Sequence, residues 1–188
     1  LNQKGEYDVY PLQMGSGKYK VQLYRQASGN QYSSVASVSF EVALQSELAP
    51  YLCPNQYVWY QEDSEAAALS RRLCEELAGD AEKVSAIYDY VVRNTLYDYI
   101  QALTVQKGYL PDVDATLARG KGICFDVAAL MACMLRTQDI PTQLVIGWAD
   151  QSYHAWNNVY LDGQWLRYDA TAAISNTKVN AYTQERVY

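Results

Sequence analysis

The stretch Arg119-Gly120-Lys121-Gly122-Ile123-Cys124-Phe125-Asp126 decides how this chain folds, because a glycine-rich turn runs directly into an apolar segment. Residues 127–135 are almost entirely apolar, so the sequence predicts a buried helix that begins at or near Cys124 and ends at about residue 137. Unpaired N–H groups and the helix dipole at such an N-terminus favour the thiolate form of a cysteine. Cys124 is therefore a candidate nucleophile, and its own N–H is a candidate oxyanion donor.

The chain contains a single histidine, His154. Every mechanism that moves a proton through imidazole at neutral pH must therefore use this residue. A zinc site with two or three histidine ligands cannot be built, and the cysteines show no Cys-x-x-Cys spacing. We therefore expect neither a metal nor another cofactor. The four cysteines are Cys53, Cys74, Cys124 and Cys133.

His154 and Asp169 lie on two predicted strands that the hairpin signal Asp162-Gly163 joins. If this turn sets the register, residues whose numbers sum to about 325 face each other, which places His154 opposite Thr171 and Asp169 one diagonal step away. A carboxylate there would fix the tautomer and the orientation of the imidazole. Taken singly, the three residues would be a core cysteine, a packed histidine and a turn aspartate. Taken together, Cys124, His154 and Asp169 indicate a nucleophile, a base and an orienting group.

These motifs resemble the transglutaminase-like core of bacterial proteins, over roughly residues 60 to 171. The resemblance implies a papain-like α+β fold, with helices packed on an antiparallel sheet, and a Cys124–His154–Asp169 triad that acts through a thioester. At Asp139 the family usually has a glycine that ends the helix, a difference expected to affect stability more than chemistry. Besides the nucleophile stretch, the resemblance rests on Ile140-Pro141-Thr142, His154-Ala155-Trp156-Asn157, Asp162-Gly163-x-Trp165 and Asp169-x-Thr171.

The resemblance also implies a second oxyanion donor, because the family commonly supplies one from a polar or aromatic side chain upstream of the nucleophile. The candidates are Tyr97, Tyr99 and Tyr109, among which the sequence does not choose. Trp156 is expected to wall the cleft or to pack beneath it. Asp126 is interpreted as a first-turn carboxylate favoured by the helix dipole, rather than as a second base.

The order of the predicted elements, helices before an antiparallel meander, is typical of an α+β fold. Residues 1–48 are interpreted as a unit of three or four β-strands that could belong to a sandwich, 49–60 as a connector and 61–188 as the catalytic domain. Residues 98–119 are predicted to be irregular. The other predicted elements are helices over 63–78 and from residue 80, strands over 142–149, 154–161 and 164–171, and an edge strand near the C-terminus.

Composition and the first residue of the chain indicate which partners the protein binds and where it works. The 188 residues are about half apolar and carry a net charge of −6, which provides for a core and argues against nucleic acid and anionic membrane surfaces. No apolar run approaches the length needed to span a bilayer. The chain starts at Leu1 rather than Met, so we expect a removed upstream signal or anchor and an extracytoplasmic location, secreted or at the cell surface. The sequence does not decide whether Cys53 and Cys74 form a disulfide.

The sequence thus predicts acyl transfer on peptide or glutamine amide carbonyls through a thioester. Hydrolysis is favoured over transfer to an amine, because water needs no dedicated second site. The expected partner is a peptide or protein substrate, which could be associated with the cell wall. The alternatives are a non-catalytic module of the same fold that binds peptide or cell-wall polymer, and a structural module dominated by the N-terminal strands.

Overall fold

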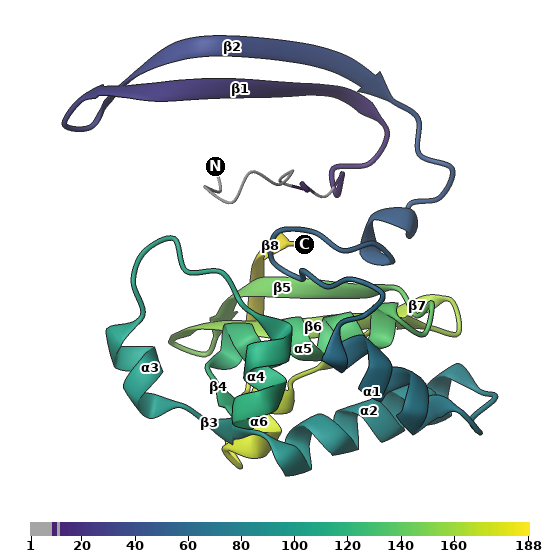
Figure 1. The fold of residues 1–188 in the computed structure, drawn as a ribbon. Coiled ribbons are helices and arrows are strands. Elements are labelled where there is room, and N and C mark those ends of the chain that lie inside the picture. Colours follow the sequence, from purple (N-terminus) through teal and green to yellow (C-terminus); the bar gives the residue numbers. More distant parts are fainter. Residues whose placement is uncertain (1–8, 11) are drawn as a thin grey trace.

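The computed structural model describes residues 9, 10 and 12–188, and their core has the predicted α+β architecture (Figure 1). A four-stranded antiparallel sheet has the strand order β7-β6-β5-β8, and helix α5 packs on β5 and β6. Helices α1, α2 and α4 surround α5 on its other sides. The bounds are Glu65–Cys74 for α1, Asp80–Asn94 for α2, Val113–Arg119 for α4, Cys124–Arg136 for α5, Thr142–Ala149 for β5, Ser152–Leu161 for β6, Gln164–Tyr168 for β7 and Tyr182–Val187 for β8.

Helix α5 is the centre of the core, since every residue from Asp126 to Arg136 is buried. A helix that is apolar nearly all round must be covered on all sides. Its start at Cys124 agrees with the sequence prediction. Just before it, Gly122 faces the Asp126 side chain, and a Cβ at Gly122 would lie 2.6 Å from Asp126 Cβ. Close packing of the turn against Asp126 therefore explains why this position is a glycine.

The prediction of irregular structure over residues 98–119 was wrong. This segment holds α3 (Tyr99–Thr104) as well as α4. Both helices are too short to show a helical repeat of apolar residues, so periodicity did not reveal them. Their start signals were present, because the carboxylates of Asp98 and Asp112 accept N-capping hydrogen bonds from Gln101 N and Ala115 N, each at 2.9 Å.

The predicted hairpin register is confirmed, since Leu161 faces Gln164 and Asn157 faces Tyr168. Strand β7 ends at Tyr168, however, so the expected pairing of His154 with Thr171 does not form. Asp169 instead caps the short helix α6 (Ala170–Ile174). The sequence overextended this strand because an aspartate that ends a strand can also begin a helix. The predicted edge strand near the C-terminus exists as β8 and pairs with β5.

The N-terminal region forms a long antiparallel hairpin, β1 (Gly17–Ser28) and β2 (Gln31–Val42), to one side of the core (Figure 1). The described part of 1–48 therefore carries two strands rather than three or four. Residues 1–8 and 11 of that predicted unit lie outside the described residues. The connector range holds the single turn η1 (Ala49–Tyr51). The boundaries at 48 and 60 stay predictions.

The structure describes all four cysteines as free thiols. Cys53 is exposed and Cys74 is buried, so the disulfide that the sequence left open is not formed. Burial raises the pKa of Cys133 to about 12 and also raises the pKa of Cys74, which keeps both thiols protonated. Within the described residues, none of the helices combines the length and the apolar character needed to cross a membrane.

Candidate active site

The fold brings the three candidate triad residues together from three elements. Cys124 opens α5, His154 lies on β6, and Asp169 follows the end of β7. His154 Nε2 lies 2.9 Å from Asp169 Oδ2. The other ring nitrogen, Nδ1, is then free of Asp169, and Cys124 lines the same cavity as this imidazole. The histidine thus contacts the carboxylate that the sequence places beside it, whereas the roles of nucleophile, base and orienting group stay a prediction.

Electrostatics favour a charged His154–Asp169 pair at neutral pH. Burial opposes the imidazolium, but hydrogen bonds to Asp169 and Cys124 outweigh it and raise the pKa of His154 to about 9. Burial would likewise raise the pKa of Asp169. The hydrogen bond and charge of His154, together with hydrogen bonds from Ala172 N and the Tyr182 hydroxyl, hold that pKa below its ordinary value instead.

The pKa of His154 gives a direct test, because the protein has one imidazole and its NMR signal needs no assignment. We expect a titration midpoint near pH 9. The imidazolium is favoured in the folded state, so the stability that it contributes is fully present below about pH 6.5 and is lost as the pH rises through about 9. A midpoint near 6.5 would mean that the His154–Asp169 contact contributes nothing in solution.

A cavity of about 270 Å³ opens beside Cys124. Cys124 and His154 line it together with Tyr97 from β3 (Leu96–Tyr97), Tyr153 from β6 and several residues of segment 171–179. The cavity therefore presents the thiol and the imidazole to one bound group. Asp169 stands behind the imidazole, with its side chain only 7% exposed.

Of the four sequence candidates for the oxyanion donor or the cleft, only Tyr97 lines this cavity. Tyr99 is 67% exposed and meets the Tyr97 ring edge-on, with centroids 4.9 Å apart. The Tyr109 hydroxyl instead donates to Asp126 Oδ1 at 2.6 Å. Trp156 is buried, with its ring 6.3 Å from the His154 ring. It packs beside the histidine and does not wall the cavity. Burial and the nearby Cys124 raise the pKa of Tyr97, which keeps its hydroxyl protonated and able to donate.

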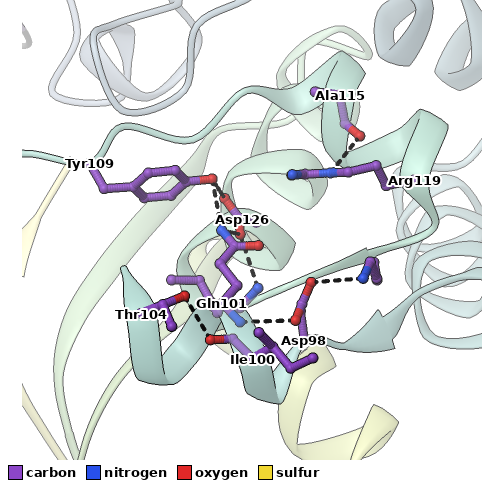
Figure 2. Close-up of polar contacts among 10 residues, drawn as sticks. Asp98, Ile100, Gln101, Thr104, Tyr109, Ala115, Arg119 and Asp126 are labelled. Atoms are coloured by element: carbon purple, nitrogen blue, oxygen red, sulfur yellow. Dashed lines mark hydrogen bonds and ion pairs between the residues drawn. The ribbon is translucent and has the colours of Figure 1, made fainter. Parts of the chain in front are cut away.

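Asp126 is fully buried and organises the turn that carries Cys124. Its Oδ2 accepts hydrogen bonds from Ile123 N at 2.9 Å and from Gln101 Nε2 at 2.8 Å, and its Oδ1 accepts the one from Tyr109 (Figure 2). The carboxylate thus satisfies a free N–H at the start of α5, as a first-turn carboxylate should. It also ties α3 and the following loop to the residue next to Cys124.

Sequence reasoning missed Tyr182, on β8. Its hydroxyl donates to Asp169 Oδ2 at 2.8 Å, the oxygen that also faces His154. The Tyr182 ring packs edge-on against Trp156 and lies 3.9 Å from the Arg167 guanidinium carbon. Burial and the charge of Asp169 raise the pKa of Tyr182, so the hydroxyl stays a donor. The contact depends on how the chain returns after α6, and no local pattern around residue 182 signals it.

Comparison with known proteins agrees with this geometry. The profile of the Transglutaminase-like superfamily matches residues 67–170, which is more than half of the chain. The chain belongs to the transglutaminase-like superfamily. The matched range contains Cys124, His154 and Asp169, whereas the β1–β2 hairpin and Tyr182 lie outside it. No curated protein sequence matches the chain.

Solved structures of low sequence identity share the transglutaminase-like fold. A candidate cysteine protease from Cytophaga hutchinsonii has a TM-score of 0.61 at 18% identity, over 100% of this chain and 74% of that one. The periplasmic domain of TgpA from Pseudomonas aeruginosa has a TM-score of 0.54 at 20% identity, over 69% of this chain and 48% of that one. A TGase has a TM-score of 0.52 at 20% identity, over 88% and 47%. This chain spans about half the length of the TgpA domain and of the TGase.

Proposed function

We propose that this transglutaminase-like protein is an enzyme that forms a thioester at Cys124 with a peptide or glutamine-side-chain carbonyl. The observation that carries the proposal is the 2.9 Å contact between His154 Nε2 and Asp169 Oδ2, made directly behind a cavity that Cys124 lines. An imidazole held in this way keeps its second nitrogen aimed at the thiol, which is what an acyl-transfer triad requires.

In the first half-reaction the Cys124 sulfur attacks the carbonyl carbon while the thiol proton resides on His154. The developing oxyanion accepts hydrogen bonds from Cys124 N–H and, we propose, from the Tyr97 hydroxyl. His154 then gives its proton to the leaving nitrogen, the C–N bond breaks, and ammonia or an amine departs. The acyl group remains as a thioester on Cys124.

In the second half-reaction water attacks the thioester carbonyl. His154 takes a proton from that water, the C–S bond breaks, and the thiolate–imidazolium pair is restored. We propose hydrolysis, the reaction of a peptidase or amidase, over transfer to an amine, because water needs no binding site of its own. Mass spectrometry of the product formed with a primary amine present distinguishes the carboxylic acid of hydrolysis from the substituted amide of transfer.

Thiol labelling tests the proposed function and separates it from a non-catalytic binding module of the same fold. A thiolate at Cys124 should react with iodoacetamide at lower pH than the exposed Cys53 does. Intact mass and peptide mapping measure both rates in one sample. His154→Ala should slow labelling of Cys124 and leave labelling of Cys53 unchanged. Equal rates at the two cysteines in the unsubstituted protein would refute the enzyme proposal.

We propose that the substrate is a peptide or protein and that the protein works outside the cytoplasm. The net charge of −6 supports a partner other than nucleic acid. The similar TgpA structure is a periplasmic domain, which is compatible with this location. Fractionation of cells that express the full-length gene checks it, and recovery in the cytoplasmic fraction would contradict it.

The Tyr182 hydroxyl is proposed to hold Asp169, and Tyr182→Phe removes it without changing the ring. Because a hydrogen bond to a charged group contributes about 1.5–3 kcal/mol, we expect kcat to fall roughly tenfold or more with KM little changed. The carboxylate oxygen would then face His154 alone, so the NMR midpoint of the histidine should move upward. Tyr32→Phe, on the exposed hairpin, is the control. An unchanged kcat and midpoint would assign Tyr182 a packing role only.

A further inference from the structure

Helix α3 exposes its large apolar side chains to the solvent and turns Gln101 to the protein. Tyr99, Ile100 and Leu103 are 67%, 75% and 88% exposed, and no residue of the helix is fully buried. Gln101, by contrast, is partly buried and points to the core side of the helix (Figure 2). A surface helix normally buries its apolar stripe, so α3 is reversed relative to ordinary packing.

Polar contacts hold α3 in this orientation (Figure 2). Gln101 Nε2 donates to Asp126 Oδ2 at 2.8 Å and to the Tyr109 hydroxyl at 3.0 Å. Asp98 caps the helix and pairs with Lys121 Nζ at 3.2 Å. The helix is thus anchored to the turn of the nucleophile by a buried carboxylate, which leaves its large apolar side chains free for another contact. Such clustered apolar exposure marks an interaction surface.

The apolar surface continues into the wall of the catalytic cavity. Tyr97 lines the cavity together with Cys124. The Tyr97 ring in turn contacts the Tyr99 ring edge-on, with centroids 4.9 Å apart. We call the side chains of Tyr99, Ile100 and Leu103 the α3 apolar surface. A chain bound in the cavity at Cys124 and extending past Tyr97 would meet this surface next.

We propose that the α3 apolar surface docks a large apolar side chain of the acyl-donor peptide, a few residues away from the reacting carbonyl. This inference rests on the proposed function and adds the substrate class to it. Continuity with the cavity through Tyr97 and Tyr99 favours a peptide as the occupant. An anionic lipid surface is disfavoured by the net charge of −6, because surface-binding apolar helices rely on basic residues for attraction to such lipids.

The test measures how well peptides protect Cys124 from iodoacetamide, which needs no turnover. The probes are peptides with a central glutamine and a single leucine, placed in turn at each of the four positions on either side of the glutamine. Each is compared with the peptide that has serine at the same position. Burial of a leucine side chain stabilises a complex by about 1.5–3 kcal/mol. The best leucine peptide should therefore protect Cys124 at a concentration roughly tenfold or more below that of the serine peptide. The double variant Ile100→Ser/Leu103→Ser should lose this preference.

Both substitutions remove exposed side chains, so the fold should be retained, and labelling of Cys124 without peptide should be unchanged. Val38→Ser is the matched control, because Val38 is 56% exposed on the separate β1–β2 hairpin, and this variant should keep the leucine preference. Docking is overturned if leucine and serine peptides protect equally, or if the double variant keeps the preference. The proposal is also overturned if the only effect of the double substitution is weaker binding of the protein to phosphatidylcholine or phosphatidylglycerol vesicles. Unreactive Cys124 in the unsubstituted protein would instead reject the proposed function.

Discussion

Turnover of a labelled glutamine peptide is expected to fall to near background in His154→Ala and in Cys124→Ala. The first variant removes the only imidazole of the chain, so no other side chain can take over proton transfer. The second removes the proposed nucleophile. Because the two residues act as one unit, the double variant Cys124→Ala/His154→Ala should be no slower than either single variant.

Circular dichroism must show that each of these variants folds, and Cys53→Ser serves as a control that removes an exposed thiol outside the cavity. Cys53→Ser should keep full activity. Near-normal turnover by a folded His154→Ala protein would make the histidine part of the scaffold and would exclude the proposed mechanism. A double variant much slower than both single variants would show that Cys124 and His154 contribute independently.

The parts of the site that the sequence predicted are those fixed by local rules. A two-residue turn at Asp162-Gly163 leaves one register for β6 and β7, and this register places Asp169 near His154. Likewise, a polar turn followed by a long apolar run allows few starting points for α5. These constraints act over a few residues, so they can be read without knowledge of the rest of the chain.

The parts that the sequence did not predict depend on contacts between distant segments. Tyr97, Tyr99 and Tyr109 are close in sequence, but the chain passes from β3 into α3 and then into a loop, so Tyr97 lines the cavity whereas the Tyr109 hydroxyl reaches Asp126. Tyr182 reaches Asp169 only because β8 returns beside β5. Helix α3 itself was missed because six residues are too few to show a helical repeat, and its position depends on the distant contact of Gln101 with Asp126.

Asp126 connects the two proposals at the level of structure. It accepts hydrogen bonds from the turn before Cys124 and from Gln101 on α3, and its own side chain is fully buried. A buried carboxylate is retained only where donors satisfy it, so the nucleophile turn and α3 are held by the same group. A peptide that docks on α3 therefore contacts an element fixed directly to the catalytic turn.

Asp169→Asn is expected to lower the rate by a factor of up to about 10⁴ and to leave more activity than His154→Ala does. The asparagine keeps the size of the side chain but removes the negative charge. Its amide can also donate to Nε2, which favours the imidazole tautomer with the proton on Nδ1, toward the thiol. The base is then present in the wrong form, so residual activity comes from the minor tautomer.

The same substitution should move the pH dependence in a defined direction. The Asp169 carboxylate is one of the two groups that raise the pKa of His154 from 6.5 to about 9, so without its charge the midpoint should fall toward 6.5. The imidazolium that protonates the leaving nitrogen is then lost at lower pH, and the alkaline limb of kcat/KM should shift down with it. NMR titration of the single histidine and a pH profile of kcat/KM measure the two shifts independently. A midpoint that falls while the alkaline limb stays in place would mean that another group donates the proton to the leaving nitrogen.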